Sequence, residues 1–294
     1  MSNKTNIVIS TFQKHIDDLK PKLEGVTEAM PLEEFYKISN NIRTSFFMIQ
    51  GLCRVFSKAF ESKTFEKWLI KCKLIEDALG ELDFYNNGIL PHLTDEKENG
   101  KVKDKILKAH KNIFSILKDD GWLTGERIKM MEDKLPTLVF DEEKKKIEKF
   151  FQKEIEKVVA FHQDISYDHM EDQVHEMRRK IRWISIYAQA LNGLIQVKKD
   201  KKNESFKKYL TEEIVTSKFN KMPPSNHDQN IYFDQDAFYA VSWIINELGV
   251  IKDDGLFMEY MQDTTKEKEL LQRAKKVCTV FFEEDEILQK LIVK

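Results

Sequence analysis

The residues best suited to bind a charged ligand lie in one stretch, Asp172 to Val197. Within it, His175, Arg178 and Arg182 recur at three- and four-residue spacing, so in an α-helix they form a single stripe. Apolar residues recur on a neighbouring stripe, which predicts that the cations lie at the edge of the core or over a cleft. Desolvated cations are costly unless an anion pairs with them. The stretch therefore predicts either an anion-binding site or internal ion pairs with Asp and Glu.

Signals for catalysis and metal binding are weak. An isolated histidine such as His175 is more often a hydrogen-bonded, half-buried side chain than a catalytic base, and no acid or nucleophile stands at a fixed spacing that would complete a catalytic set. The sequence has no glycine-rich phosphate loop, HExxH, CxxC or GxSxG motif. We therefore predict no enzyme, no catalytic residues and no cofactor.

The stretch from His162 to His175 is rich in imidazoles and carboxylates, which are potential metal ligands. On a helix, only two subsets of its side chains share a face, and the paired Glu-x-x-His motifs of di-iron bundles are absent. We therefore predict no metal. The residues considered are His162, Asp164, Asp168, His169, Asp172 and His175.

Overall charge limits the classes of partner. The chain has 294 residues, with 48 Lys and Arg against 50 Asp and Glu, so it is close to neutral. A protein that coats nucleic acid usually carries a large basic excess. Nucleic acid is therefore an improbable partner, and any anion site must be a local cluster of cations.

Cysteine usage and hydropathy indicate the compartment. Cys53, Cys72 and Cys278 are an odd number without CxxC spacing, which favours a reducing environment over a disulfide framework or a zinc site. The first residues become charged too early for a signal peptide, and no apolar run is long enough to cross a bilayer. We expect a cytoplasmic protein without membrane association.

The pattern of apolar residues is helical throughout. The chain has only 10 Gly and 6 Pro, so long helices are expected, and no stretch alternates with a period of two residues. The predicted fold class is all-α. A loop is expected over residues 85–100, and residues 198–230 are expected to be an exposed, partly mobile excursion that includes a solvated lysine-rich linker. The expected helices cover residues 6–23, 31–60, 63–84, 101–118, 126–135, 141–165, 172–197 and 238–248, followed by two or three short helices after residue 256.

The helical pattern breaks once, between Pro136 and Phe140. We predict a domain boundary at this break. An N-terminal helical bundle is expected over residues 1–138 and a C-terminal helical bundle over residues 139–294.

The two halves align as a weak internal repeat. The segment FYKISNNIRTSFFMIQGL, from Phe35, aligns without gaps with VHEMRRKIRWISIYAQAL, from Val174. A second block aligns LIEDALGELDF with WIINELGVIKD in the same order along the chain. Two blocks in one order indicate a duplication. The alignment pairs Tyr36 with His175, Ser39 with Arg178, Arg43 with Arg182, and Gly80 with Gly249.

A helix reading HxxRxxxR, followed by a helix ending Leu-Gly-x-Leu/Ile-x-Asp, twice per chain, resembles the conserved histidine α-helical domain, CHAD. The resemblance spans roughly residues 30–90 and 170–255, and the motif is best kept in the second half. It implies two antiparallel four-helix bundles related by a pseudo-twofold axis, with basic helices lining a cavity that binds inorganic polyphosphate. In the first half, Tyr36 and Ser39 replace the motif histidine and its first arginine, and the chain lacks the family's general basic excess.

Two functions follow from the sequence. The first is a non-enzymatic module that binds inorganic polyphosphate or another linear polyanion, because phosphate oxygens accept charge-assisted hydrogen bonds from arginine and an imidazole adds charge at mildly acidic pH. The second is a structural or protein-interaction helical protein that kept the fold and lost the ligand. The candidate polyanion-binding residues are His175, Arg178, Arg182, Arg43, Lys37, Arg179 and Lys198.

Overall fold

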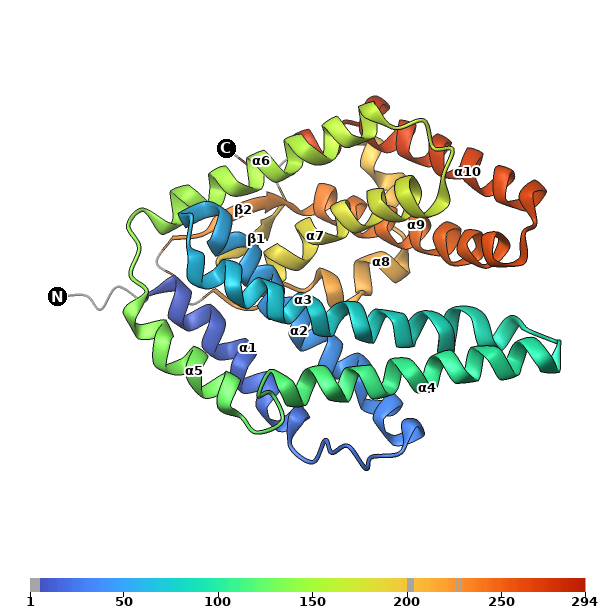
Figure 1. The fold of residues 1–294 in the computed structure, drawn as a ribbon. Helices are drawn as coiled ribbons and strands as arrows, with labels where there is room; N and C mark the ends of the chain where they lie inside the picture. The colour runs from blue at the N-terminus through green and yellow to red at the C-terminus, as the bar shows by residue number, and fades with distance from the viewer. Residues whose placement is uncertain (1–5, 200–203, 226, 228, 294) are drawn as a thin grey trace. The chain divides into compact units, whose positions relative to one another are not determined.

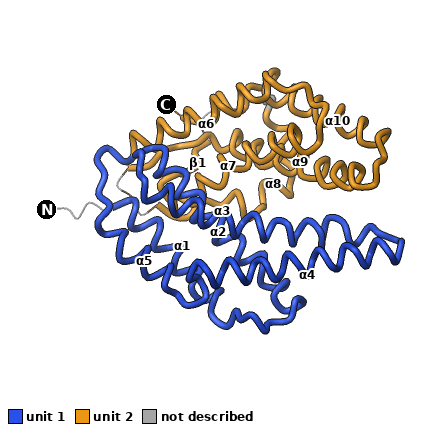
Figure 2. The backbone as a smooth tube through the Cα atoms, in the orientation of Figure 1, with its two compact units in different colours: residues 1–143 blue, residues 144–294 orange. Residues whose placement is uncertain are grey.

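Helices dominate the computed structural model, which describes residues 6–199, 204–225, 227 and 229–293 (Figure 1). The chain divides into two compact units, residues 1–143 and 144–294 (Figure 2). The predicted helical fold class is confirmed in its main part. Among the described residues, no helix is long and apolar enough to cross a membrane.

The first unit is built around one long helix, α2, which packs against both α1 and α3. The side chain of Asn6 caps the start of α1, and Asp95 caps α4 in the same way by accepting a hydrogen bond from a backbone N–H of the first turn. Figure 1 shows α3 and α4 running side by side as a long hairpin. The helices are α1 (Ile7–Leu23), α2 (Leu32–Phe60), α3 (Lys63–Asp83), α4 (Glu96–Asp119) and α5 (Glu126–Lys134).

The second unit is organised around α9, which packs against α7 and α10. Its start is capped by Asp234, whose carboxylate accepts a hydrogen bond of 2.8 Å from the Ala237 N–H. Helix α9 is longer than the predicted residues 238–248. The residue that follows it, Gln262, adopts the left-handed conformation and caps the helix. The helices are α6 (Glu143–Asp164), α7 (Glu176–Ala190), α8 (Glu212–Thr216), α9 (Gln235–Met261) and α10 (Thr264–Thr279).

A two-stranded parallel sheet interrupts the helices of the second unit. Strands β1 (Ile195–Lys198) and β2 (Ile231–Asp234) pair in register from Ile195 with Ile231 onward. The prediction that one helix continues to Val197 is wrong here. Helix α7 ends at Ala190 and Gly193 adopts a φ of 89°, which turns the chain out of the helix before the β-branched residues of β1.

The start of the predicted helix over residues 172–197 also differs. Met170–His175 forms a π-helical turn, and regular α-helix begins only at Glu176. In the first unit, the predicted loop over residues 85–100 instead contains a π-helical turn, Phe84–Ile89, and a short 3-10 turn, Leu90–His92. The Asp95 cap then starts α4 earlier than predicted.

The predicted exposed excursion is anchored to the second unit by a few buried side chains. The side chains of Phe206, Tyr209, Ile214 and Asn220 are buried, and the amide of Asn220 donates a 2.7 Å hydrogen bond to the Ile214 carbonyl. Burial of these aromatic and apolar groups outweighs the polar composition around them. The prediction of exposure is wrong for these four residues, whereas most other described side chains of the segment are exposed. Residues 200–203 of the expected lysine-rich linker lie outside the described residues.

The turn between α7 and β1 yields a stability prediction. A Cβ atom at Gly193 would lie 2.4 Å from the Pro224 carbonyl oxygen, a backbone atom that cannot move alone. Gly193→Ala should therefore lower the free energy of unfolding by about 3 kcal/mol, from left-handed strain of about 1 to 2 kcal/mol plus this clash. Urea denaturation followed by circular dichroism measures the loss.

Gly25→Ala is the matched control. Gly25 has a φ of 82° but no atom within 4 Å of a Cβ placed there, so only the left-handed strain of about 1 to 2 kcal/mol is expected. Equal losses for the two variants would show that the approach of Pro224 does not constrain the turn.

Candidate functional site

Arg43 projects from α2 towards α3 and is closely paired with acidic groups. Its guanidinium donates hydrogen bonds of 3.0 Å to the Glu76 carboxylate and 2.9 Å to the Asp83 carboxylate, and it lies 5.3 Å from the centre of the Phe47 ring. A Cβ at Gly80 would lie only 3.0 Å from Arg43 Nη2, so the glycine makes room for the guanidinium. In this arrangement two carboxylates already neutralise Arg43.

Arg178 occupies a related position in the second unit. It reaches from α7 to α9, where its Nε donates a 3.0 Å hydrogen bond to the Ile245 carbonyl oxygen. A Cβ at Gly249 would lie 3.1 Å from the same nitrogen. A carbonyl is a neutral acceptor, so this contact orients the guanidinium while leaving its charge in place.

The glycine contacts test the register of the sequence repeat. Gly80 and Gly249 are aligned in that repeat, but Arg43 contacts the first glycine and Arg178 contacts the second. The alignment pairs Arg43 with Arg182, which lies one helical turn further along α7. These contacts do not support the predicted register, and the duplication stays a prediction.

The other charged groups near the start of α7 have acidic neighbours. His175 Nδ1 lies 2.9 Å from the Glu171 carboxylate, and this hydrogen bond holds the pKa of the Glu171 carboxyl below its ordinary value. Glu176 forms ion pairs with both Arg179 and Lys180. Most of these groups are partly exposed, so each pair contributes little to stability, but each places negative charge beside a predicted ligand-binding cation.

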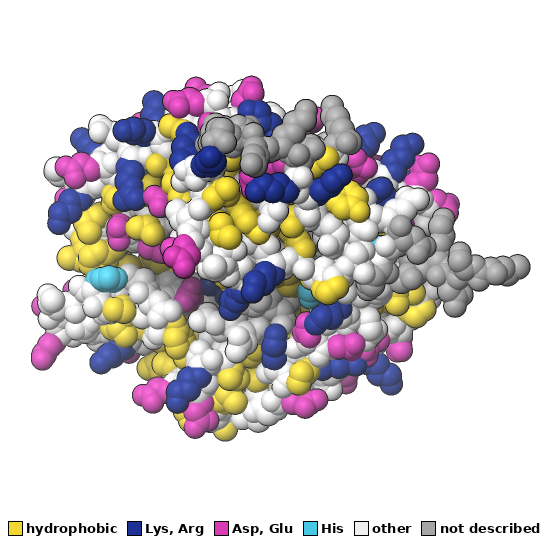
Figure 3. Space-filling model, turned by 180° about the vertical axis from the view of Figure 1, so that it is seen from behind, with side chains coloured by type: hydrophobic (Ala, Val, Ile, Leu, Met, Phe, Trp, Pro, Cys, Tyr) yellow, Lys and Arg dark blue, Asp and Glu magenta, His cyan; other side chains and the backbone are white. Residues whose placement is uncertain are grey.

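The remaining predicted residues differ in exposure. Arg182 is half-buried in α7 and contacts neighbouring groups. Lys37 on α2 and Lys198 at the end of β1 are exposed. The second unit thus brings His175, Arg178 and Arg182 onto one helix or its entry turn, whereas Lys37 belongs to the first unit. On the face drawn in Figure 3, basic side chains are interspersed with acidic ones.

A buried polar network in the second unit was not predicted. His162 Nδ1 lies 2.7 Å from the Tyr167 hydroxyl, and its Nε2 lies 3.0 Å from the Glu283 carboxylate. The imidazole also stacks on Phe282, with ring centres 4.5 Å apart. Sequence spacing alone could not find this network, because Glu283 and Phe282 are distant from His162 along the chain.

This polar network has a structural rather than a reactive role. Burial raises the pKa of the Tyr167 hydroxyl well above its ordinary value, and burial raises the pKa of the neighbouring Cys278 thiol to about 12. Both groups are therefore protonated near neutral pH, and Cys278 is a poor nucleophile. No cluster of three or more potential metal-ligating side chains occurs in the described parts of the chain.

Comparisons with known proteins identify the fold. No family model and no curated protein matches the chain. A crystal structure of the CHAD domain from the plant Ricinus communis is similar to it, with a TM-score of 0.54 and 12% sequence identity over 97% of this chain and 89% of that chain. The chain therefore has the fold of a CHAD domain. The resemblance predicted from the motif on α7 is confirmed at the level of fold.

The ion pairs of Arg43 lead to a second prediction. Arg43→Gln leaves the partly buried carboxylates of Glu76 and Asp83 without their cation, so the free energy of unfolding should fall by about 2 kcal/mol. Chemical denaturation of the purified variant measures this change.

A second substitution separates charge from packing. Adding Glu76→Gln to Arg43→Gln removes one of the uncompensated carboxylates and should restore part of the lost stability. A double variant that is as unstable as the sum of both single changes would show that Arg43 acts by packing rather than by pairing.

Proposed function

We propose that this protein is a non-enzymatic binding module for a linear polyanion such as inorganic polyphosphate. The observation that carries the proposal is the row of His175, Arg178 and Arg182 on α7 and its entry turn, in a chain that has the fold of a CHAD domain. Arg178 Nε donates a hydrogen bond to the Ile245 carbonyl oxygen, which holds the side chain where α7 packs on α9. The similarity to a CHAD domain supports a binding role rather than catalysis.

The proposed site lies in the second unit, on α7 and its entry turn. Arg178 and Arg182 donate charge-assisted hydrogen bonds to phosphate oxygens, and guanidinium geometry suits this because it presents paired donors. His175, Arg179 and Lys198 add positive charge near this helix. Glu171 and Glu176 are the acids with which the phosphates compete, so we expect weaker binding than in a strongly basic CHAD domain.

The first unit contributes less to the proposed site. Arg43 can bind phosphate only after its hydrogen bonds to Glu76 and Asp83 break. The free energy lost with these bonds offsets most of the free energy that the phosphate contact supplies. Lys37 is exposed on the same helix. It can attract a polyanion at low salt but has little geometric specificity.

A protein-interaction or structural role is the second candidate. The observation that favours it is the pairing of Arg43, His175 and Arg179 with carboxylates of their own unit. Such pairs are expected where basic residues have become part of the structural framework. In that case the fold is retained and the polyanion ligand is lost.

Titration of fluorescently labelled polyphosphate distinguishes the two candidates. We expect saturable binding at low salt that weakens steeply as salt is added, because each neutralised phosphate releases counterions. Arg178→Gln combined with Arg182→Gln should weaken binding by roughly a hundredfold, by analogy with the loss of two charge-assisted hydrogen bonds. Circular dichroism checks that helicity is unchanged.

The matched control replaces two exposed lysines of the same unit, Lys153→Gln with Lys268→Gln. It removes the same net charge at positions on α6 and α10. Absence of saturable binding, or equal loss in the two double variants, would favour the interaction or structural role.

A further inference from the structure

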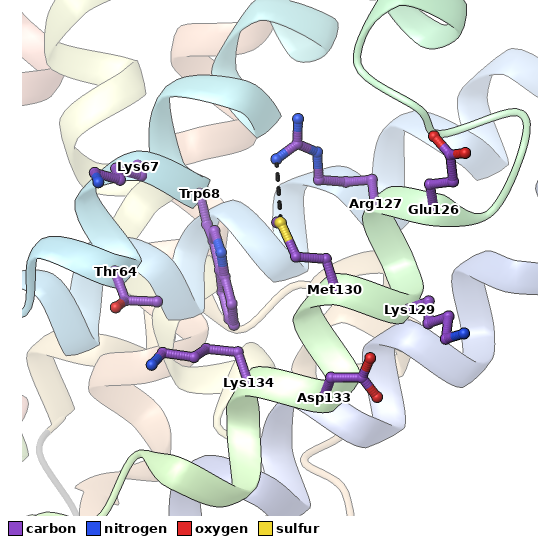
Figure 4. Close-up of a pocket in the computed structure, with 9 residues that line it drawn as sticks. All are labelled: Thr64, Lys67, Trp68, Glu126, Arg127, Lys129, Met130, Asp133 and Lys134. Carbon is purple, nitrogen blue, oxygen red and sulfur yellow. Dashed lines mark hydrogen bonds between the residues drawn. The ribbon is translucent and has the colours of Figure 1, made fainter.

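The first unit contains a cavity of about 620 Å³ between the beginning of α3 and the short helix α5 (Figure 4). Its volume is within the range of sites that bind small molecules. The cavity lies in the first unit, so it is separate from the proposed polyanion site on α7. Its lining combines an aromatic and a thioether side chain with basic groups from two helices.

The apolar part of the cavity is formed by Trp68 and Met130. Trp68 is only 5% exposed, and its ring packs edge-on against Phe12 and Phe65 at centroid distances of 5.7 and 5.4 Å. These contacts hold the indole in place. Met130 is 43% exposed, and in Figure 4 its side chain lies beside the indole with the sulfur directed towards Arg127, which donates a 3.9 Å hydrogen bond to it. A flexible thioether beside a fixed aromatic ring suits a flat aromatic ligand.

The basic part of the cavity lies on one side of the indole. In Figure 4 the Lys67 and Lys134 ammonium groups lie on the same side of Trp68 as the Thr64 hydroxyl. Both lysines are exposed, and among the described residues neither ammonium group makes a hydrogen bond or ion pair. They come from different helices, so an anion between them could accept hydrogen bonds from both.

The other charged groups of the lining are oriented differently. Arg127 is held by Asp120, whose carbonyl oxygen accepts a 3.0 Å hydrogen bond from the arginine Nε. Figure 4 shows the side chains of Glu126, Lys129 and Asp133 directed away from Trp68. The negative charges of the lining are therefore turned away from the side where the lysines gather.

We propose that this cavity binds a small organic anion that carries an aromatic ring. The ring lies against Trp68 and Met130, and its carboxylate or phosphate group accepts hydrogen bonds from Lys67, Lys134 and Thr64. A bare inorganic anion leaves the apolar surface uncovered, and a neutral aromatic compound leaves the lysines without a counter-charge. Both features of the lining thus select the same class of ligand.

Isothermal titration calorimetry with naphthyl phosphate tests the proposal on the full chain. Saturable binding is expected for this compound, which has both the ring and the charge. Naphthalenemethanol has the ring alone and inorganic phosphate has the charge alone, so each should bind at least roughly tenfold more weakly. Equal binding of inorganic phosphate would overturn the proposal in favour of a simple anion site.

Substitutions locate the binding. Lys67→Gln combined with Lys134→Gln should weaken naphthyl phosphate binding by roughly tenfold, because two partly solvated charge-assisted contacts are lost. Met130→Ser should weaken it by removing the apolar contact. Lys129→Gln is the control, since it removes a lysine from the same lining whose side chain is directed away from the indole.

All of these variants change exposed side chains, and unchanged thermal unfolding establishes that they fold. No saturable binding of naphthyl phosphate, or an equal effect of Lys129→Gln and the Lys67/Lys134 double substitution, refutes the proposal. The polyphosphate titration reports on α7 separately, so failure of one hypothesis leaves the other intact.

Discussion

The close approach of an arginine side chain to a helical glycine is the contact on which the proposed site depends. Arg43 lies over Gly80 where α2 packs on α3, and Arg178 lies over Gly249 where α7 packs on α9. Glycine within a helix costs about 1 kcal/mol relative to alanine. That cost is offset where the missing Cβ lets a guanidinium lie flat against a neighbouring helix and reach polar atoms beyond it.

The polar atoms that the guanidinium contacts differ between the two units. In the first unit the atoms beyond the glycine are carboxylates of Glu76 and Asp83. In the second unit, the aligned positions carry Ile245 and Lys252, and Arg178 meets a backbone carbonyl instead. Similar packing against a glycine therefore places Arg43 on two carboxylates, while one of the contacts of Arg178 is a backbone carbonyl oxygen.

Several helices could be predicted because their apolar residues recur with the period of a helix over many turns. The boundaries of α2 and α3 follow from this pattern together with Pro31 and the residues around Ser62. Strand β1 could not be predicted in this way, because Ile195 and Val197 also continue the apolar stripe of α7. Only the backbone turn at Gly193 separates the two elements.

Side-chain partners were harder to predict than helices. A row of cations on α7 could be recognised from spacing, but the acids that pair with Arg43 come from another helix, and a sequence pattern does not specify how one helix is rotated against another. The cavity beside Trp68 was missed for a related reason. In the sequence, Trp68 resembles an ordinary core residue and Met130 an ordinary surface residue. That both line one cavity is evident only once α3 and α5 are known to be adjacent.

The carboxylates around α7 bear on which class of anion the proposed site would favour. A monoanion that displaces Glu176 from Arg179 gains one ion pair and loses another, so little free energy remains. A linear polyanion differs because its phosphates are joined, and once one phosphate is bound the next binds at a high effective concentration. Cations that already have acidic neighbours can therefore still hold a chain of phosphates while discriminating against single ones. Ion pairs within the site are thus compatible with selectivity for a polymeric ligand.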